Sequence, residues 1–210
     1  MFPEVLNHHQ MELLPVLKGF SKKFYLVGGT AIALQIGHRR SNDFDLFTGK
    51  PIDKLKIKPK FLSPYAIQKV LWEDKEQIHL MANHVKITFF HYPFNIQANV
   101  PFQHFLKMPD LLSLAAMKAL ALGGRAKWKD YVDLFFLLKE YFTLQEISGK
   151  AKQLFEGSFN PKLFREQLAY YDDVDYSEAV EFMPGFETPP EAIEQFLTET
   201  ALQWPFSGGL

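Results

Sequence analysis

Two aspartates at alternate positions of an apolar segment are the residues of this chain best suited to do chemistry. Asp43 and Asp45 lie in "DFDLF", where Phe44 and Leu46 alternate with them. Side chains of a strand alternate between its faces, so both carboxylates would emerge on one side and the apolar residues on the other. Two adjacent carboxylates repel each other, and a divalent cation such as Mg²⁺ relieves that repulsion. The pair predicts a metal site; the alternative is an edge strand with both acids on its exposed face.

A doubled glycine precedes the aspartates at the point where a strand should turn into a helix. Gly28 and Gly29 stand between "KFYLV" and "TAIALQIGH", and Gly37 is suited to end that short helix. The free N–H groups of a helix start bind anions, and glycine lets a phosphate approach the backbone. An ordinary tight turn is the alternative. The segment has neither a P-loop lysine nor "GxGxxG", which excludes the P-loop ATPase and dinucleotide-binding classes.

Basic residues occur next to both features. His38, Arg39 and Arg40 precede the aspartates, where they can meet negative charge on a substrate or simply form a solvated loop. Lys118 is the one charged residue between Leu111 and Leu122, so it either extends to solvent or meets an anion.

The order of these features resembles a known family. "GG", a short helix and "SxDxD" are similar to the nucleotidyltransferase fold shared with DNA polymerase beta, and "GGTAIALQIGHRRSNDFDLF" resembles more narrowly the AbiEii (AbiGii) toxin family. The resemblance implies that Asp43 and Asp45 bind Mg²⁺ and act in catalysis. It also implies a nucleotide-binding set consisting of Gly28, Gly29, Thr30, Arg39, Arg40, Ser41 and Arg125.

The resemblance continues into "LLSLAAMKALALGGRAKWKDYVDLFFLL" and covers residues 24 to 185 approximately. It implies that Lys118 contacts phosphate and that Asp130 or Asp133 reaches the active site, where it orients Lys118 or the attacking hydroxyl; we take Asp130 as the catalytic one. Without the resemblance, two acids three residues apart at a helix start need no other explanation than the helix dipole.

One departure from the polymerase-beta pattern concerns the third carboxylate, which such enzymes usually take from a later strand. The sequence has no Asp or Glu from Gln77 to Pro109, and the strand concerned offers Lys86, Thr88 and His91. An acid of the helical half such as Asp130 fills the role, or one metal ion suffices, or the chain binds nucleotide without efficient turnover.

The element pattern predicts an α+β protein: a mixed sheet of the nucleotidyltransferase fold with helices, followed by a mainly helical half. We expect an α/β core over residues 1–108 and a helical region over 109–210 that completes the active-site cleft. The expected strands are 23–27 and 43–47 with a hairpin over 77–92, and the expected helices are 3–20, 30–38, 66–71, 111–122, 129–142, 144–155, 161–169 and 190–202.

Composition limits the possible functions. The chain of 210 residues is 47% hydrophobic, which suffices for a packed core, and its net charge of −1 gives no overall attraction to nucleic acid. Zero cysteines exclude disulfides and thiolate chemistry. Neither a secretion signal nor a membrane span is visible, so we expect a cytoplasmic protein. Lysines at alternate positions from Lys54 to Lys60, together with Lys50, can follow an RNA backbone or form a solvated loop.

These observations predict a magnesium-dependent nucleotidyltransferase that moves a nucleoside monophosphate from an NTP onto an acceptor hydroxyl. The resemblance implies a toxin of a bacterial toxin-antitoxin or phage-defence pair, with tRNA as acceptor and a cognate antitoxin as partner. Two alternatives stay open: nucleotidylation of a protein or small molecule, and a non-catalytic nucleotide-binding module.

Overall fold

The computed structural model describes residues 1–203 of the chain. The chain divides into two compact units, the first covering Met1–Leu114 and the second beginning at Ala115. The division falls inside helix α4 (Leu111–Leu122), a few residues after the boundary predicted at 108–109. The last part of the predicted helical region, residues 204–210, lies outside the described residues.

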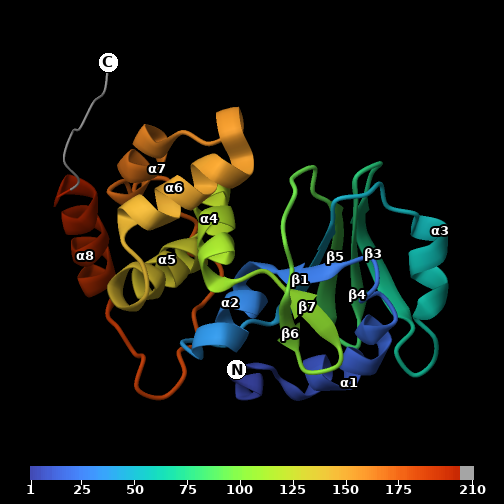
Figure 1. Ribbon diagram of the computed structural model, residues 1–210. Coiled ribbons are helices and arrows are strands. Elements are labelled where there is room, and N and C mark those ends of the chain that lie inside the picture. The colour runs from blue at the N-terminus through green and yellow to red at the C-terminus, as the bar shows by residue number, and fades with distance from the viewer. Residues whose placement is uncertain (204–210) are drawn as a thin grey trace. The chain divides into compact units, whose positions relative to one another are not determined.

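The first unit is built on a five-stranded mixed sheet with the strand order β1-β2-β5-β4-β3. Strand β2 pairs antiparallel with β1 and parallel with β5. The β3-β4-β5 part, whose strands are labelled in Figure 1, is antiparallel throughout. A separate ribbon pairs β6 with β7. The elements are α1 (His8–Lys18), β1 (Tyr25–Val27), α2 (Gly28–Ile36), β2 (Asp43–Thr48), α3 (Lys54–Ile57), β3 (Ile67–Glu73), β4 (Gln77–Ala82), β5 (Val85–His91), β6 (Val100–Phe102) and β7 (Leu106–Met108), with 3₁₀ turns at Pro3–Val5 and Lys58–Lys60.

Period-two burial identifies the core face of this sheet. Phe44 and Leu46 of β2 are fully buried, as are Ile87 and Phe89 of β5, with which they are in register. Phe20, from the segment before β1, packs its ring against Phe89 with the ring centroids 4.8 Å apart. Burial of this apolar face leaves the alternate residues of the same strands to form the opposite face of the sheet.

The predicted hairpin over residues 77–92 is confirmed as strands β4 and β5. A two-residue turn joins them, and its residues Asn83 and His84 both have positive φ, 47° and 61°. Turns of this kind match the twist of antiparallel strands, and asparagine tolerates the left-handed conformation better than most residues. The turn sets the register that brings His79 beside Thr88.

The helix predicted over residues 66–71 is wrong, because this segment is the edge strand β3. Five of its backbone positions are in register with β4, but shifts between Ile67 and Lys69 and between Val70 and Trp72 interrupt the alternation. Such bulges remove the period-two pattern by which a strand is recognised in sequence. The ribbon β6-β7 was not predicted at all, since three-residue strands carry almost no periodic signal.

Helices make up the second unit, as predicted. After α4 come α5 (Trp128–Glu140), α6 (Leu144–Phe155), α7 (Pro161–Leu168) and α8 (Pro190–Gln203), with a 3₁₀ turn at Glu156–Ser158 (Figure 1). Side chains cap several helix starts: Asp110 accepts from the Ser113 N–H at 2.8 Å, and Thr143 forms a capping box with Glu146. The mixed sheet and these helices confirm the α+β class. None of the helices within residues 1–203 has both the length and the apolar character that crossing a bilayer requires.

Candidate active site

The sheet places the two predicted metal ligands on the face opposite the core. Asp43 and Asp45 are both half-buried, while Phe44 and Leu46 between and beyond them are fully buried. Asp45 is in register with Val27, the last residue of β1. The glycine turn starts at the next residue, so the strand pairing itself brings the turn beside Asp45.

Gly28 allows the carboxylate of Asp45 to lie against the turn. Its φ is +72°, and a Cβ atom built on it would be 2.3 Å from Asp45 Oδ2. Gly29 is approached in the same way by Arg39, whose Nη2 atom would be 2.4 Å from an added Cβ. Any larger residue at either position would displace a charged group, so the two glycines, Asp45 and Arg39 form one compact arrangement.

Three further residues of the predicted nucleotide-binding set, Thr30, Arg40 and Ser41, hold this arrangement together, whereas Arg125 belongs to the second unit. Thr30 bonds to the backbone carbonyl of Asp43 and, at 2.9 Å, to Ser41 Oγ. Arg39 is 2% exposed and donates to the carbonyl of Arg40 at 2.8 Å, and Arg40 in turn donates to the carbonyl of Glu4 at 3.0 Å. The structure therefore brings Gly28, Gly29, Thr30, Arg39, Arg40 and Ser41 together around the start of β2.

Strand β5 contributes a cation and a hydroxyl at the place where the polymerase-beta pattern has a third carboxylate. Lys86 is in register with Asp43, with its Nζ 3.6 Å from Asp43 Oδ2, and Thr88 is in register with Asp45. The side chains of Lys86 and Asp43 are 39% and 42% exposed, so water screens this pair and either partner can turn to a ligand at little cost. Lys86 partly compensates the mutual repulsion of the two aspartates.

His79 is the site-facing residue that the sequence analysis missed. Gln77 Nε2 donates to Asp74 at 3.1 Å, which directs Gln77 Oε1 to His79 Nε2 at 2.9 Å. The proton of the ring is thereby held on Nε2, and Nδ1 is left to accept from the Thr88 hydroxyl at 3.3 Å. Burial, followed by repulsion from Lys86, lowers the pKa of His79, while Asp45 and Asp74 oppose that shift. The sequence signal for His79 was its alternate spacing with Gln77, and this spacing can be interpreted only when the register of β4 and β5 is known.

The donors on this face fit a magnesium ion that takes its remaining ligands from water and from the substrate. No three or more His, Asp or Glu side chains within residues 1–203 form a preformed cation cage. Mg²⁺ is commonly bound by one or two carboxylates, with water and substrate phosphates completing its six ligands. Asp43 and Asp45 supply such a carboxylate pair.

The second unit contains its own cluster of charged residues. Lys118 Nζ lies 2.6 Å from Asp130 Oδ1 and 2.9 Å from Asp133 Oδ2, and Arg125 Nε lies 3.1 Å from Asp130 Oδ2. Lys118 and both aspartates are at most 6% exposed, whereas the Arg125 side chain is 56% exposed. Two carboxylates thus hold Lys118 in place, and Arg125 joins the cluster from its solvent side.

A family comparison covers the part of the chain that holds the two strand aspartates. Residues 15–93 match the model described as "Nucleotidyl transferase AbiEii toxin, Type IV TA system". The matched segment is therefore similar to an AbiEii nucleotidyltransferase domain. All five strands of the main sheet belong to it, together with Asp43, Asp45 and the glycine turn, while Lys118, Arg125 and Asp130 lie beyond the matched segment.

Relatives extend the similarity over most of the chain. An uncharacterised protein of Aquifex aeolicus is 28% identical over 201 residues, which covers 92% of this chain and 97% of the relative. The toxin MenT4 of Mycobacterium tuberculosis, a nucleotidyltransferase, has a similar structure, with a TM-score of 0.62 at 13% identity over 94% of this chain and 84% of MenT4. Helicobacter pylori JHP933 gives a TM-score of 0.58 at 17% identity over 92% and 89%. The chain therefore has the fold of these solved structures over nearly its whole length.

Proposed function

We propose that the chain is a magnesium-dependent nucleotidyltransferase toxin that transfers a nucleoside monophosphate from an NTP to an acceptor hydroxyl and releases pyrophosphate. The observation that carries this proposal is the Asp45 carboxylate lying against the Gly28 turn on the exposed face of the sheet. A metal ligand and an anion-binding turn side by side are what a metal-bound triphosphate requires.

Asp43 and Asp45 would hold the ion, whose chemistry is to neutralise the phosphate charge and so lower the barrier to displacement. The helix start at Gly28 and Gly29 would bind the phosphates, and Arg39 beside Gly29 adds positive charge there. Phosphoryl transfer depends mainly on positioning of the reacting groups and on positive charge near the phosphates. These residues would supply both without any covalent intermediate.

With two strand carboxylates, the site is suited to one protein-bound ion. Lys86 opposite Asp43 contributes a positive charge that a second ion would otherwise bring. In this proposal Lys118 stabilises the phosphates and Asp130 orients it, with Arg125 as a nucleotide contact; the close pairing of Lys118 with Asp130 supports the orienting role. The type IV toxin-antitoxin family and MenT4 support the toxin role with an antitoxin as partner, and tRNA is the acceptor that we propose.

Incorporation of labelled nucleotide tests the proposal. The purified chain is incubated with each of the four labelled NTPs and Mg²⁺, together with total tRNA, with lysate protein or alone. We expect label on tRNA, its loss on removal of Mg²⁺ with EDTA, and a decrease on the order of 10²- to 10³-fold in Asp45→Asn. The matched control is Asp172→Asn, which makes the same change at an exposed residue of the second unit and should retain full activity.

Equal incorporation by wild type and Asp45→Asn would refute the assignment of the metal site. Label on protein would replace tRNA as acceptor but keep the reaction. A second candidate function, nucleotide binding without turnover, has one observation in its favour, namely Lys86 in place of a third carboxylate. Mg²⁺-dependent NTP binding without incorporation on any acceptor would decide for it.

A further inference from the structure

A group of lysines lies at the end of the main sheet opposite the glycine turn. Lys22 and Lys23 precede β1, and Lys50 follows β2. Because Tyr25 pairs with Phe47, these two strand ends are neighbours. Asp43 is at the other end of β2, roughly 16 Å away at about 3.3 Å per residue, so the lysines form a region separate from the candidate active site.

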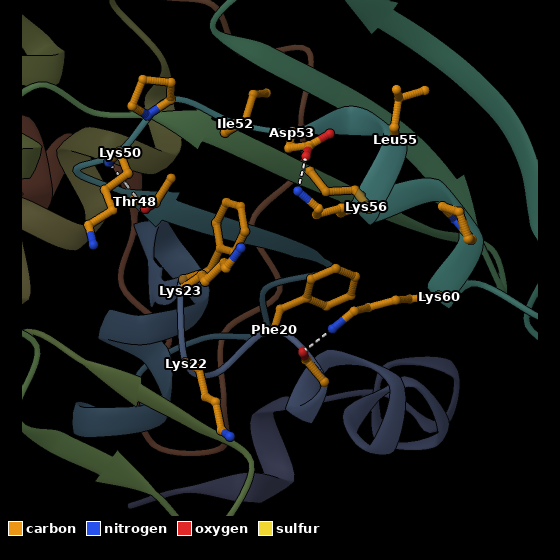
Figure 2. Close-up of a pocket in the computed structure, with 15 residues that line it drawn as sticks. Phe20, Lys22, Lys23, Thr48, Lys50, Ile52, Asp53, Leu55, Lys56 and Lys60 are labelled. Atoms are coloured by element: carbon orange, nitrogen blue, oxygen red, sulfur yellow. Dashed lines mark hydrogen bonds and ion pairs between the residues drawn. The ribbon is translucent and has the colours of Figure 1, made fainter.

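Two hollows meet at these lysines. One has a volume of about 490 Å³ and the other about 510 Å³, and both are lined by Lys22, Lys23, Thr48 and Lys50. Apolar residues complete each of them, among them Phe20, Phe24 and Ile57 in the first and Phe94 and Ile96 in the second. Figure 2 shows the first hollow, with Lys23 and Thr48 on one side and with Phe20 and Lys60 on the other.

The lysines shared by the two hollows have no acidic partner. Lys56 pairs with Asp53 at 2.6 Å, and Lys60 bonds to the Gly19 carbonyl with its ammonium over the Phe20 ring (Figure 2). Within residues 1–203, by contrast, no carboxylate oxygen lies within 4 Å of the ammonium groups of Lys22, Lys23 and Lys50. Like charges gathered without a counter-charge favour an anionic ligand.

The second hollow also contains a polar atom that lacks a partner. Tyr25 lines it, and the buried hydroxyl of Tyr25 makes no hydrogen bond within the described residues. Burial raises the pKa of this phenol, so it stays protonated and able to donate. Buried polar atoms are rarely left unsatisfied, so this hydroxyl beside the hollow is a donor that the described residues do not use.

We propose that the two hollows and the lysines between them bind a single strand of nucleic acid, with one base in each hollow and the connecting phosphate at Lys22, Lys23 and Lys50. Each hollow has the size of a small-ligand site. Single-stranded nucleic acid is typically bound by positive charge along its backbone combined with apolar contacts to its bases. An acidic peptide without aromatic residues would pair with the lysines but has no planar rings to fill the apolar hollows.

Salt-dependent binding tests this inference without any use of NTP or metal. Fluorescence anisotropy is measured with a labelled unstructured RNA oligonucleotide, with its DNA counterpart and with an acidic peptide of equal charge. The test variant is Lys22→Ala/Lys23→Ala/Lys50→Ala. The control is Lys69→Ala/Lys107→Ala/Lys152→Ala, which removes the same charge from exposed lysines elsewhere.

We expect the test variant to bind RNA on the order of ten-fold more weakly than wild type, while the control stays near wild type. The slope of log affinity against log salt should become shallower by about 0.7 in the test variant, since one phosphate lies at these lysines and each phosphate contact of a single strand contributes about 0.7. The RNA and DNA arms distinguish the two sources of the strand. Equal losses in both variants, an unchanged slope, or equally tight binding of the acidic peptide would overturn the inference.

This site does not depend on the proposed transfer reaction. Asp45→Asn should bind the oligonucleotide as wild type does, because Asp45 lies at the glycine-turn end of β2. The test variant should keep Mg²⁺-dependent NTP binding. Failure of either function can therefore be recognised separately.

Discussion

The chain has two clusters of paired aspartates, and they differ in what the protein itself provides for them. Asp43 and Asp45 are half-buried, and the lysine opposite Asp43 is 3.6 Å away and largely solvated. Asp130 and Asp133 are buried with Lys118 at 2.6 and 2.9 Å, and Arg125 completes the charge balance. The first cluster is half-open to solvent, whereas the second is enclosed by the protein.

This difference in burial suits the two clusters to different roles: a half-exposed cluster can bind a ligand, and a buried cluster can hold a side chain in position. A buried charge must be paired inside the protein, because removal from water costs several kcal/mol per ion. A half-exposed carboxylate pair keeps its contact with water and can exchange that water for a metal ion. We infer that the strand aspartates receive the ion and that the helix aspartates fix Lys118.

The largest expected effect tests the buried cluster. Lys118→Met removes the cation that lies 2.6 Å from Asp130 and 2.9 Å from Asp133 in a buried cluster, and we expect the free energy of unfolding to fall by about 3–5 kcal/mol. Urea denaturation followed by circular dichroism measures it. Lys152→Met, at an exposed position, is the matched control and should change stability by less than about 0.5 kcal/mol. A loss below about 1 kcal/mol in Lys118→Met would mean that the two clusters do not differ as described.

The next effect tests the contact between the turn and the strand aspartates. Gly28→Ala requires φ of +72° from an alanine and places its Cβ where Asp45 Oδ2 lies, so we expect a loss of about 1–3 kcal/mol. Gly149→Ala is the control, because nothing lies within 4 Å of its Cβ position inside α6, and it should stabilise by up to about 1 kcal/mol. Equal stability of the two variants would show that the turn does not require glycine.

A smaller effect tests whether the strength of an ion pair depends on the solvent exposure of its side chains and not on the unit in which the pair lies. Lys127 and Lys129 lower the pKa of Glu178 to about 2, although its side chain is 42% exposed. A lowered folded pKa means that the pairs stabilise the fold above the unfolded pKa, near 4.5, and that this contribution is lost as the pH falls toward about 2. Glu178→Gln should therefore cost less than about 1 kcal/mol at pH 7 and nothing near pH 2. A pH series of thermal unfolding shows it, and a penalty that persists at pH 2 would contradict the pairing.

The smallest effect belongs to the strand aspartates themselves. Asp43→Asn removes one of two repelling charges but also the solvated partner of Lys86, and we expect a change within about 0.5 kcal/mol. Magnesium-dependent NTP binding should nevertheless be weakened, as calorimetry can measure. A stability loss as large as that of Lys118→Met would show that Asp43 is structural.

The sequence was informative where local pattern and local structure coincide. Alternation predicted β2 and the common face of Asp43 and Asp45, and Gly37 with φ of 73° ends α2 as expected from a glycine at that position. The hairpin followed from two apolar runs around a short polar turn. Each of these depends on contacts that are close in the sequence.

Cross-strand features could not be predicted in this way. The bulged pairing of β3 with β4 outweighs the local pattern of residues 66–71, and the chain from Gln77 through His79 to Thr88 exists only once β4 and β5 have their register. The Lys22, Lys23 and Lys50 group likewise depends on β1 and β2 ending side by side. Whether Lys118 and Arg125 contact nucleotide stays a prediction.

The parallel pairing of β2 with β5 has a consequence for synthesis of the chain. The strand that carries the aspartates obtains its inner neighbour from residues 85–91, after the whole segment 49–84 has been made. Closing so long a loop costs entropy that only the contacts of the completed sheet offset, so this pairing should form late in folding. A ribosome-bound chain that ends before β5 therefore lacks Lys86 and Thr88 beside its aspartates, so the candidate site is assembled only when the sheet is complete.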